Sequence, residues 1–163
     1  MDKVEILILR NLLYNEEYLR KVIPFIKADY YEDSNQRIVF EEIDKFVQEY
    51  NQPATKEVLC IEVEKRQDIN DTTFSEITKL ISYLEDVPTD YEWLCNTTEK
   101  WCRDRAIYLA LMESIALADG TDKDKDRGAI PSILSNALAV SFDTNIGHDY
   151  LIDYEQRYES YHK

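Results

Sequence analysis

Residues 91–142 read YEWLCNTTEKWCRDRAIYLALMESIALADGTDKDKDRGAIPSILSNALAVSF. This stretch predicts a long helix, a charged turn and a shorter helix that returns along the first. Thr89 and Glu92 match a capping pattern in which the hydroxyl and the carboxylate each accept a backbone N–H. No Gly or Pro interrupts the chain from Glu92 until Gly120, which can adopt the left-handed conformation that ends helices. Pro131 suits the first turn of the returning helix.

Apolar residues recur along the long helix at a spacing of seven. A seven-residue repeat is typical of a helix that packs against another helix over several turns. Because the returning helix is short, it cannot cover every apolar position of the long one. Either the rest of the domain covers them, or the hairpin projects and pairs with a second copy of itself. The candidate pairing residues are Leu94, Trp101, Arg105, Tyr108, Met112, Ile115, Ile133 and Ala137.

The sequence before the hairpin also has a helical period. Five helices are expected there: Val4–Tyr14, a helix capped by Asn15 and limited by Pro24, a helix starting at Ser34, one capped by Thr55, and one capped by Asp71 or Thr72. The chain has only 3 Gly and 4 Pro, which suits helices better than a sheet with many tight turns. We therefore predict an all-α fold, with a helical bundle over residues 1–90, a helical hairpin over 91–142, and a linker with a docking helix over 143–163.

The predicted C-terminal helix is amphipathic. Its apolar face consists of Tyr150, Leu151, Tyr154, Tyr158 and Tyr161. Two interpretations stay open for this face. The helix either folds back onto its own domain or docks on a partner outside it.

The charge of the chain restricts its partners. It carries 19 basic and 33 acidic residues, for a net charge of −14. A surface of this sign repels a phosphate backbone, so we expect little direct DNA binding and favour other proteins as partners. No window reaches the roughly 18 apolar residues that a membrane span needs, and no signal peptide is recognisable. The three cysteines suit buried thiols in a reducing cytoplasm.

No enzyme site is predicted from the residues. Gly120, Gly128 and Gly147 are not spaced as a phosphate-binding loop requires. The residues from Asp122 to Asp126 imitate the start of a calcium loop but lack its glycine turn and its final glutamate. We therefore expect no catalytic residue, no metal site and no cofactor in this chain.

Several short motifs, spread from one end of the chain to the other, resemble a known family. They are Val4-Glu5-Ile6, Glu17-Tyr18, Lys21-Val22, Asp29-Tyr30-Tyr31-Glu32, Trp93-Leu94, Thr98-Glu99-Lys100, Arg105-Ala106, Gly128-Ala129-Ile130-Pro131, Ser141-Phe142-Asp143, Gly147-His148-Asp149, Asp153-Tyr154-Glu155, Arg157 and Ser160-Tyr161. The block over residues 128–161 is the densest. On these motifs the chain resembles the N-terminal region of the replicative DNA helicases of T-even-type bacteriophages, members of the DnaB-like ring helicases.

The resemblance implies a role in assembly. A parent of this family is an ATP-dependent 5′–3′ DNA helicase whose separate ATPase domain holds ATP and Mg²⁺. Its N-terminal hairpins pair two by two into a trimer-of-dimers collar on a hexamer, and the collar contacts primase. The helix after the hairpin docks on the neighbouring subunit's ATPase domain. The setting would be the cytoplasm of an infected bacterial cell.

A second interpretation comes from charge alone. A free-standing acidic helical adaptor, or a protein that mimics DNA, would bind a basic partner through its surface carboxylates. It would need no ATPase domain. The tyrosine face over residues 150–161 favours the helicase interpretation, because an adaptor of that kind has no use for it.

Overall fold

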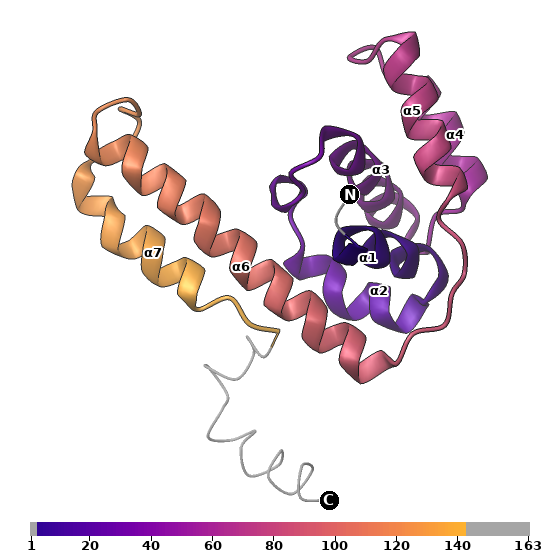
Figure 1. Cartoon of the computed structure of the whole chain (residues 1–163), viewed down its shortest axis with the longest axis horizontal. Coiled ribbons are helices and arrows are strands. Elements are labelled where there is room, and N and C mark those ends of the chain that lie inside the picture. Colours follow the sequence, from indigo (N-terminus) through magenta and orange to yellow (C-terminus); the bar gives the residue numbers. More distant parts are fainter. Residues whose placement is uncertain (1–2, 143–163) are drawn as a thin grey trace, which may run out of the picture.

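The computed structural model describes residues 3–142, and it contains helices and no strand over that range. The α-helices are α1 (Lys3–Tyr14), α2 (Glu16–Val22), α3 (Ser34–Tyr50), α4 (Lys56–Glu64), α5 (Asp71–Ser82), α6 (Tyr91–Ala118) and α7 (Ile130–Leu138). Short 3-10 helices lie at Ile23–Phe25, Ala28–Tyr30 and Arg127–Ala129. The predicted all-α fold is confirmed. Figure 1 shows α1 to α5 gathered at one end of the molecule and the α6–α7 hairpin extending away from them.

Two predicted N-caps are present. The Asn15 side chain accepts the backbone N–H of Tyr18 at the start of α2, and the Thr55 side chain accepts that of Val58 at the start of α4. In each case the side-chain oxygen satisfies one of the N–H groups that the first turn of a helix leaves without an intrahelical acceptor. Helix α2 ends at Val22, two residues before Pro24, which lies in the 3-10 helix Ile23–Phe25; the proline ring cannot continue an α-helix.

Two other caps differ from the prediction. Asn70, rather than Asp71 or Thr72, caps α5 and accepts the N–H of Thr73. Asp90, rather than Thr89, caps α6 and accepts the N–H of Trp93. A cap oxygen must reach the third helical N–H, so a helix that begins one residue away from the expected place selects a different side chain.

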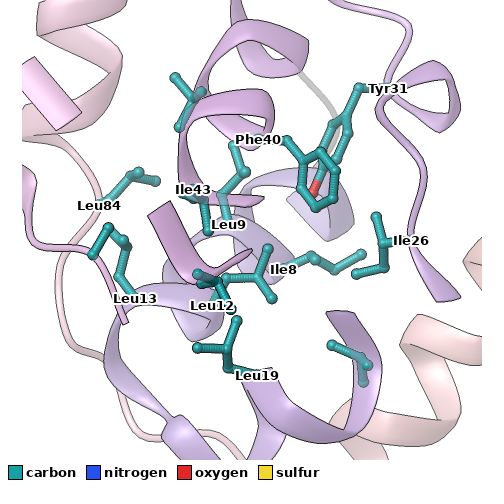
Figure 2. Close-up of a cluster of buried hydrophobic side chains, with 14 of the residues drawn as sticks. Ile8, Leu9, Leu12, Leu13, Leu19, Ile26, Tyr31, Phe40, Ile43 and Leu84 are labelled. Atoms are coloured by element: carbon teal, nitrogen blue, oxygen red, sulfur yellow. The ribbon is translucent and has the colours of Figure 1, made fainter. Parts of the chain in front are cut away.

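The bundle core is built on α1. Ile8, Leu9 and Leu12 are fully buried, and Figure 2 shows them meeting residues of the neighbouring helices. The rings of Tyr31 and Phe40 lie 5.6 Å apart beside them. Burial on this scale supplies most of the favourable free energy of folding for such a bundle.

The first half of α6 is part of the same core. Leu94, Thr98 and Cys102 are fully buried, and Trp101 is 8% exposed. The indole of Trp101 packs edge-on against Tyr30, with ring centres 5.8 Å apart, and lies 4.9 Å from the ring of Tyr31. The first half of α6 therefore belongs to the bundle, and its second half forms the hairpin with α7.

The hairpin turns where the sequence predicts. Gly120 has a φ of +83°, the left-handed conformation that glycine adopts most readily. Helix α7 then runs back along α6 (Figure 1), with Pro131 in its first turn. After α7, the Glu99 carboxylate accepts the N–H of Phe142 at 2.8 Å, and Arg103 donates to the carbonyl of Val140 at 3.0 Å. These contacts fasten the returning chain to the middle of α6.

No helix over residues 3–142 combines the length and the apolar character that a membrane crossing demands.

Candidate functional site

The outer half of α6 carries an exposed apolar stripe. Tyr108, Leu111, Met112 and Ile115 are 49%, 47%, 48% and 56% exposed. Leu111 and Met112 lie three and four residues after Tyr108, and Ile115 lies four and three residues after them, so all four lie on one side of the helix. We call these four residues the hairpin stripe. Exposed singly they would be unremarkable, but gathered on one helical face they form the kind of patch that marks a protein interface.

The opposite side of the outer half of α6 faces α7. Ala110, Ser114 and Leu117 of α6 are buried there, together with Ala137 of α7. The small side chains of Ala110, Ser114 and Ala137 let the two helices approach closely. Helix α7 packs on this side of α6 and not on the hairpin stripe, so about half of the surface of each stripe residue stays exposed.

Two of the expected interface residues lie in the core of this chain. Leu94 is fully buried and Trp101 is held between Tyr30 and Tyr31. The expectation that Leu94 and Trp101 belong to the pairing surface is therefore corrected. The residues of the seven-residue repeat do lie along one row of α6. Leu94 and Trp101 are buried in the bundle core, whereas Tyr108 and Ile115 are exposed to solvent.

Arg105 lies at the junction between these two environments. Its Nε donates to the backbone carbonyl of Tyr30, and its Nη1 is 3.7 Å from the Glu32 carboxylate. Its guanidinium also lies 4.9 Å from the centre of the Tyr108 ring, a cation–π distance. The residue thus fixes α6 to the bundle and orients the first side chain of the hairpin stripe.

The predicted interface residues of α7 differ in exposure. Ala137 is buried against α6, whereas Ile133 is half-buried. Ile133 and Ala137 line a cavity together with Tyr30, Ala106 and Leu109, in the angle between the hairpin and the bundle. They therefore belong to the inner side of the hairpin rather than to the hairpin stripe.

Leu111 is the stripe residue that the seven-residue repeat did not reveal. It lies three residues after Tyr108 and four before Ile115. The general helical spacing of three and four would have found it, since neighbours at that spacing share a face.

The described residues offer little for covalent or metal chemistry. All three cysteines are free thiols. Burial raises the pKa of Cys102 to about 12, and burial also raises the pKa of Cys95, so both are poor nucleophiles near neutral pH. Over residues 3–142 no group of three or more His, Cys, Asp or Glu residues is placed to hold a metal ion. What the outer hairpin can do is bind another protein surface.

The proposed docking face, Tyr150, Leu151, Tyr154, Tyr158 and Tyr161, lies outside the described residues.

Comparison with known proteins supplies the context for this surface. No protein-family model matches the chain. A protein of Enterobacteria phage T4, described as a DnaB-like replicative helicase, is 34% identical to it over 163 residues. The match takes in 95% of this chain and 34% of the phage T4 protein, so the chain spans about a third of the length of that relative. Over nearly its whole length, therefore, the chain is related to a DnaB-like replicative helicase, which confirms the family resemblance recognised in its sequence.

Proposed function

We propose that this chain is a non-catalytic assembly domain of a hexameric, ATP-dependent replicative DNA helicase. The observation that carries the proposal is the hairpin stripe, because a projecting helix pair with one uncovered apolar face is built to meet another surface. The relationship to a DnaB-like replicative helicase supports the same role. In this proposal the stripe pairs with the stripe of a second copy, and three such dimers form the collar of a ring.

The hairpin stripe suits an isologous contact between two copies. In such a contact the same patch of each subunit faces the other across a two-fold axis. Tyr108, Leu111, Met112 and Ile115 supply aromatic, sulfur-containing and aliphatic surface without a charged residue among them. Residues of these kinds are well suited to the centre of an interface, where charges are depleted.

Other parts of the helicase would supply the chemistry. The chain has no phosphate-binding loop, so ATP and Mg²⁺ are assigned to a separate ATPase domain and not to these residues. The net charge of −14 argues against direct contact with DNA and leaves primase and the neighbouring ATPase domain as partners.

The face over residues 150–161 is the proposed docking element for that ATPase domain. In a protein that contains both parts, Tyr154→Ala with Tyr158→Ala should weaken ring assembly, and unchanged assembly in size-exclusion chromatography would contradict the docking role.

Sedimentation velocity tests the pairing of hairpins. The wild-type chain should associate as its concentration rises, and Met112→Ser with Ile115→Ser should shift it towards monomer by at least about tenfold in dissociation constant, since central apolar residues dominate such interfaces. Ile61→Ser is the matched control, because Ile61 is 50% exposed but lies on α4, away from the hairpin.

Two outcomes would contradict the proposal. The first is a strict monomer at high concentration for the wild-type chain. The second is association that the stripe variants leave unchanged. Circular dichroism of each variant shows whether a loss of association comes from the surface or from unfolding.

A further inference from the structure

A second surface lies between α3 and α4, on the far side of the bundle from the hairpin (Figure 1). We call it the α3–α4 groove. It encloses about 210 Å³ and is lined by Glu42, Lys45, Phe46, Glu49, Tyr50, Val58, Ile61 and Glu62. Small-molecule sites usually have roughly 300–1,000 Å³, so this space suits one or two side chains of a partner better than a cofactor.

The apolar part of the groove is open to solvent. Tyr50 is 56% exposed and Ile61 is 50% exposed, one from each helix. Phe46 also lines the groove, with its ring centre 4.7 Å from that of Tyr50. An aromatic pair opposite an aliphatic side chain forms a seat for one bulky apolar residue.

Carboxylates from both helices line the same groove. Glu42 of α3 is buried, with a side chain only 4% exposed, and its Oε2 accepts from Arg66 at 2.6 Å. Its Oε1 makes no hydrogen bond within the described part of the chain. That oxygen lies 3.3 Å from Lys45 Nζ, so the contact is an ion pair without a well-directed hydrogen bond. A buried carboxylate oxygen in this state favours a better donor.

Lys45 occupies the position of such a donor. Its ammonium lies 3.3 Å from Glu42 and 3.7 Å from Glu62, which places it loosely between the two helices. The Lys45 side chain is itself 60% exposed and free to swing into solvent. The position of the Lys45 ammonium, between Glu42 and Glu62, is therefore one where a cationic side chain of a partner would also be stabilised.

Glu49 adds a third carboxylate to the groove lining. Over residues 3–142 no ion pair joins it to a basic residue, in contrast to Glu62, which pairs with Lys65 at 3.0 Å. The groove lining contains three carboxylates and one ammonium. Even when Arg66 and Lys65 neutralise Glu42 and Glu62, the rim beside Tyr50 stays acidic.

We propose that the α3–α4 groove binds a short cationic segment of another protein, with one bulky apolar residue seated among Phe46, Tyr50 and Ile61. A Lys or Arg of that segment displaces Lys45 and meets the carboxylates of Glu42 and Glu62. Charge complementarity selects this occupant. The acidic rim of the groove repels the phosphates of a nucleic acid, and it suits a cationic segment better than another copy of this chain, whose net charge is −14.

Selection from a displayed library of random peptides of about twelve residues tests the inference without choosing the ligand in advance. The wild-type chain should enrich sequences that combine Lys or Arg with a Leu, Phe or Trp. Fluorescence anisotropy then measures the affinity of the enriched peptides for each variant. Ile61→Ser should weaken binding at least about fivefold, since an apolar anchor carries much of the energy of such a contact.

Two further variants test the charges. Glu49→Lys should weaken binding, whereas Asp86→Lys, an equal change of charge in the exposed loop after α5, should have a smaller effect. Lys45→Met should strengthen binding severalfold, because it removes the competing ammonium from the carboxylates. A structural role for Lys45 alone would not produce a gain.

The matched control is Ile115→Ser on the hairpin stripe, where Ile115 is 56% exposed, close to the value for Ile61. This variant should bind the peptides as the wild type does. The inference is overturned if no basic sequence with an apolar residue is enriched, or if Ile115→Ser and Ile61→Ser weaken binding equally. It is also overturned if Ile61→Ser abolishes self-association in sedimentation, because the groove would then be a contact between copies.

Discussion

A buried pair of hydroxyl groups joins α2 to α6. Tyr18 and Thr98 are fully buried, and their oxygens are 2.6 Å apart. Because the Thr98 hydroxyl donates to the carbonyl of Leu94 at 2.8 Å, the proton between the two oxygens comes from Tyr18. Burial raises the pKa of Tyr18 above its usual value, which keeps the phenol protonated as a donor.

Replacing the acceptor of this bond should destabilise the chain. Thr98→Val keeps the shape of the side chain but leaves the Tyr18 hydroxyl buried without an acceptor, at a cost of about 1–3 kcal/mol. Denaturant unfolding measures the change, with Thr72→Val on an exposed turn of α5 as the control. In the double variant with Tyr18→Phe, part of the loss should be recovered. Additive losses would show that the two hydroxyls do not act as a pair.

The buried thiol of Cys102 should make the free energy of unfolding fall as the pH rises through the alkaline range. Its pKa is raised by burial from 9.0 to about 12, so between these values the folded chain keeps a proton that the unfolded chain has lost. The contribution is fully present below pH 9 and is lost as the pH rises, at up to about 1.4 kcal/mol per pH unit. The free energy of unfolding, measured from pH 8 to 11, should therefore fall less steeply for Cys102→Ala than for the wild type. Parallel curves would refute this role of the thiol.

At the scale of the element, α6 owes its starting point to Asp90. The Oδ2 of Asp90 accepts the N–H of Trp93 at 2.9 Å, whereas the Thr89 hydroxyl donates to the carbonyl of Val87. Asp90→Ala should lower the free energy of unfolding by about 1 kcal/mol, and Thr89→Val should change it by less than half of that amount. Thermal unfolding of the two variants compares them. If Thr89→Val proves the more harmful, Thr89 is the cap after all.

Helix α6 is also the element in which one periodic row serves two purposes. Leu94 and Trp101 pack inside the bundle, and Tyr108 and Ile115 lie in the exposed stripe. A helix longer than the bundle it packs against must leave that bundle at some residue. Here Arg105 holds α6 to Tyr30 and Glu32 at the point of departure. The stripe is therefore presented on a rigid element, which lowers the entropic cost of a contact with a partner.

At the scale of the whole molecule, the shared helix bears on where the bundle ends. Residues 1–90 are the predicted bundle, but Leu94, Trp101 and Cys102 lie in the same hydrophobic core as α1 to α5. A chain of residues 1–106 should unfold cooperatively, whereas residues 1–90 should melt broadly or aggregate, because they expose the surface that α6 covers. Calorimetry of the two chains compares them directly. A sharp, reversible transition for residues 1–90 would support the predicted boundary.

The hairpin stripe is on α6 and the groove is between α3 and α4, and Figure 1 shows the α6–α7 hairpin extending away from these two helices. A chain paired through its hairpin could therefore bind a cationic segment at the groove at the same time. The two surfaces also differ in character, since the stripe has no charged member and the groove has several. An apolar surface suits a permanent contact between copies, whereas a mixed one suits a partner that comes and goes.

The sequence by itself determined the features that depend on neighbours along the chain. The all-α fold, the caps at Asn15 and Thr55 and the left-handed turn at Gly120 follow from local periodicity, side-chain hydrogen bonding and backbone freedom. Only the tertiary structure decided which part of the seven-residue row is core and which is surface. Periodicity shows which residues share a face of a helix, but what covers that face depends on residues distant in sequence. Trp101 is buried because Tyr30 and Tyr31 reach it, and Ile115 is exposed because the bundle has ended before it.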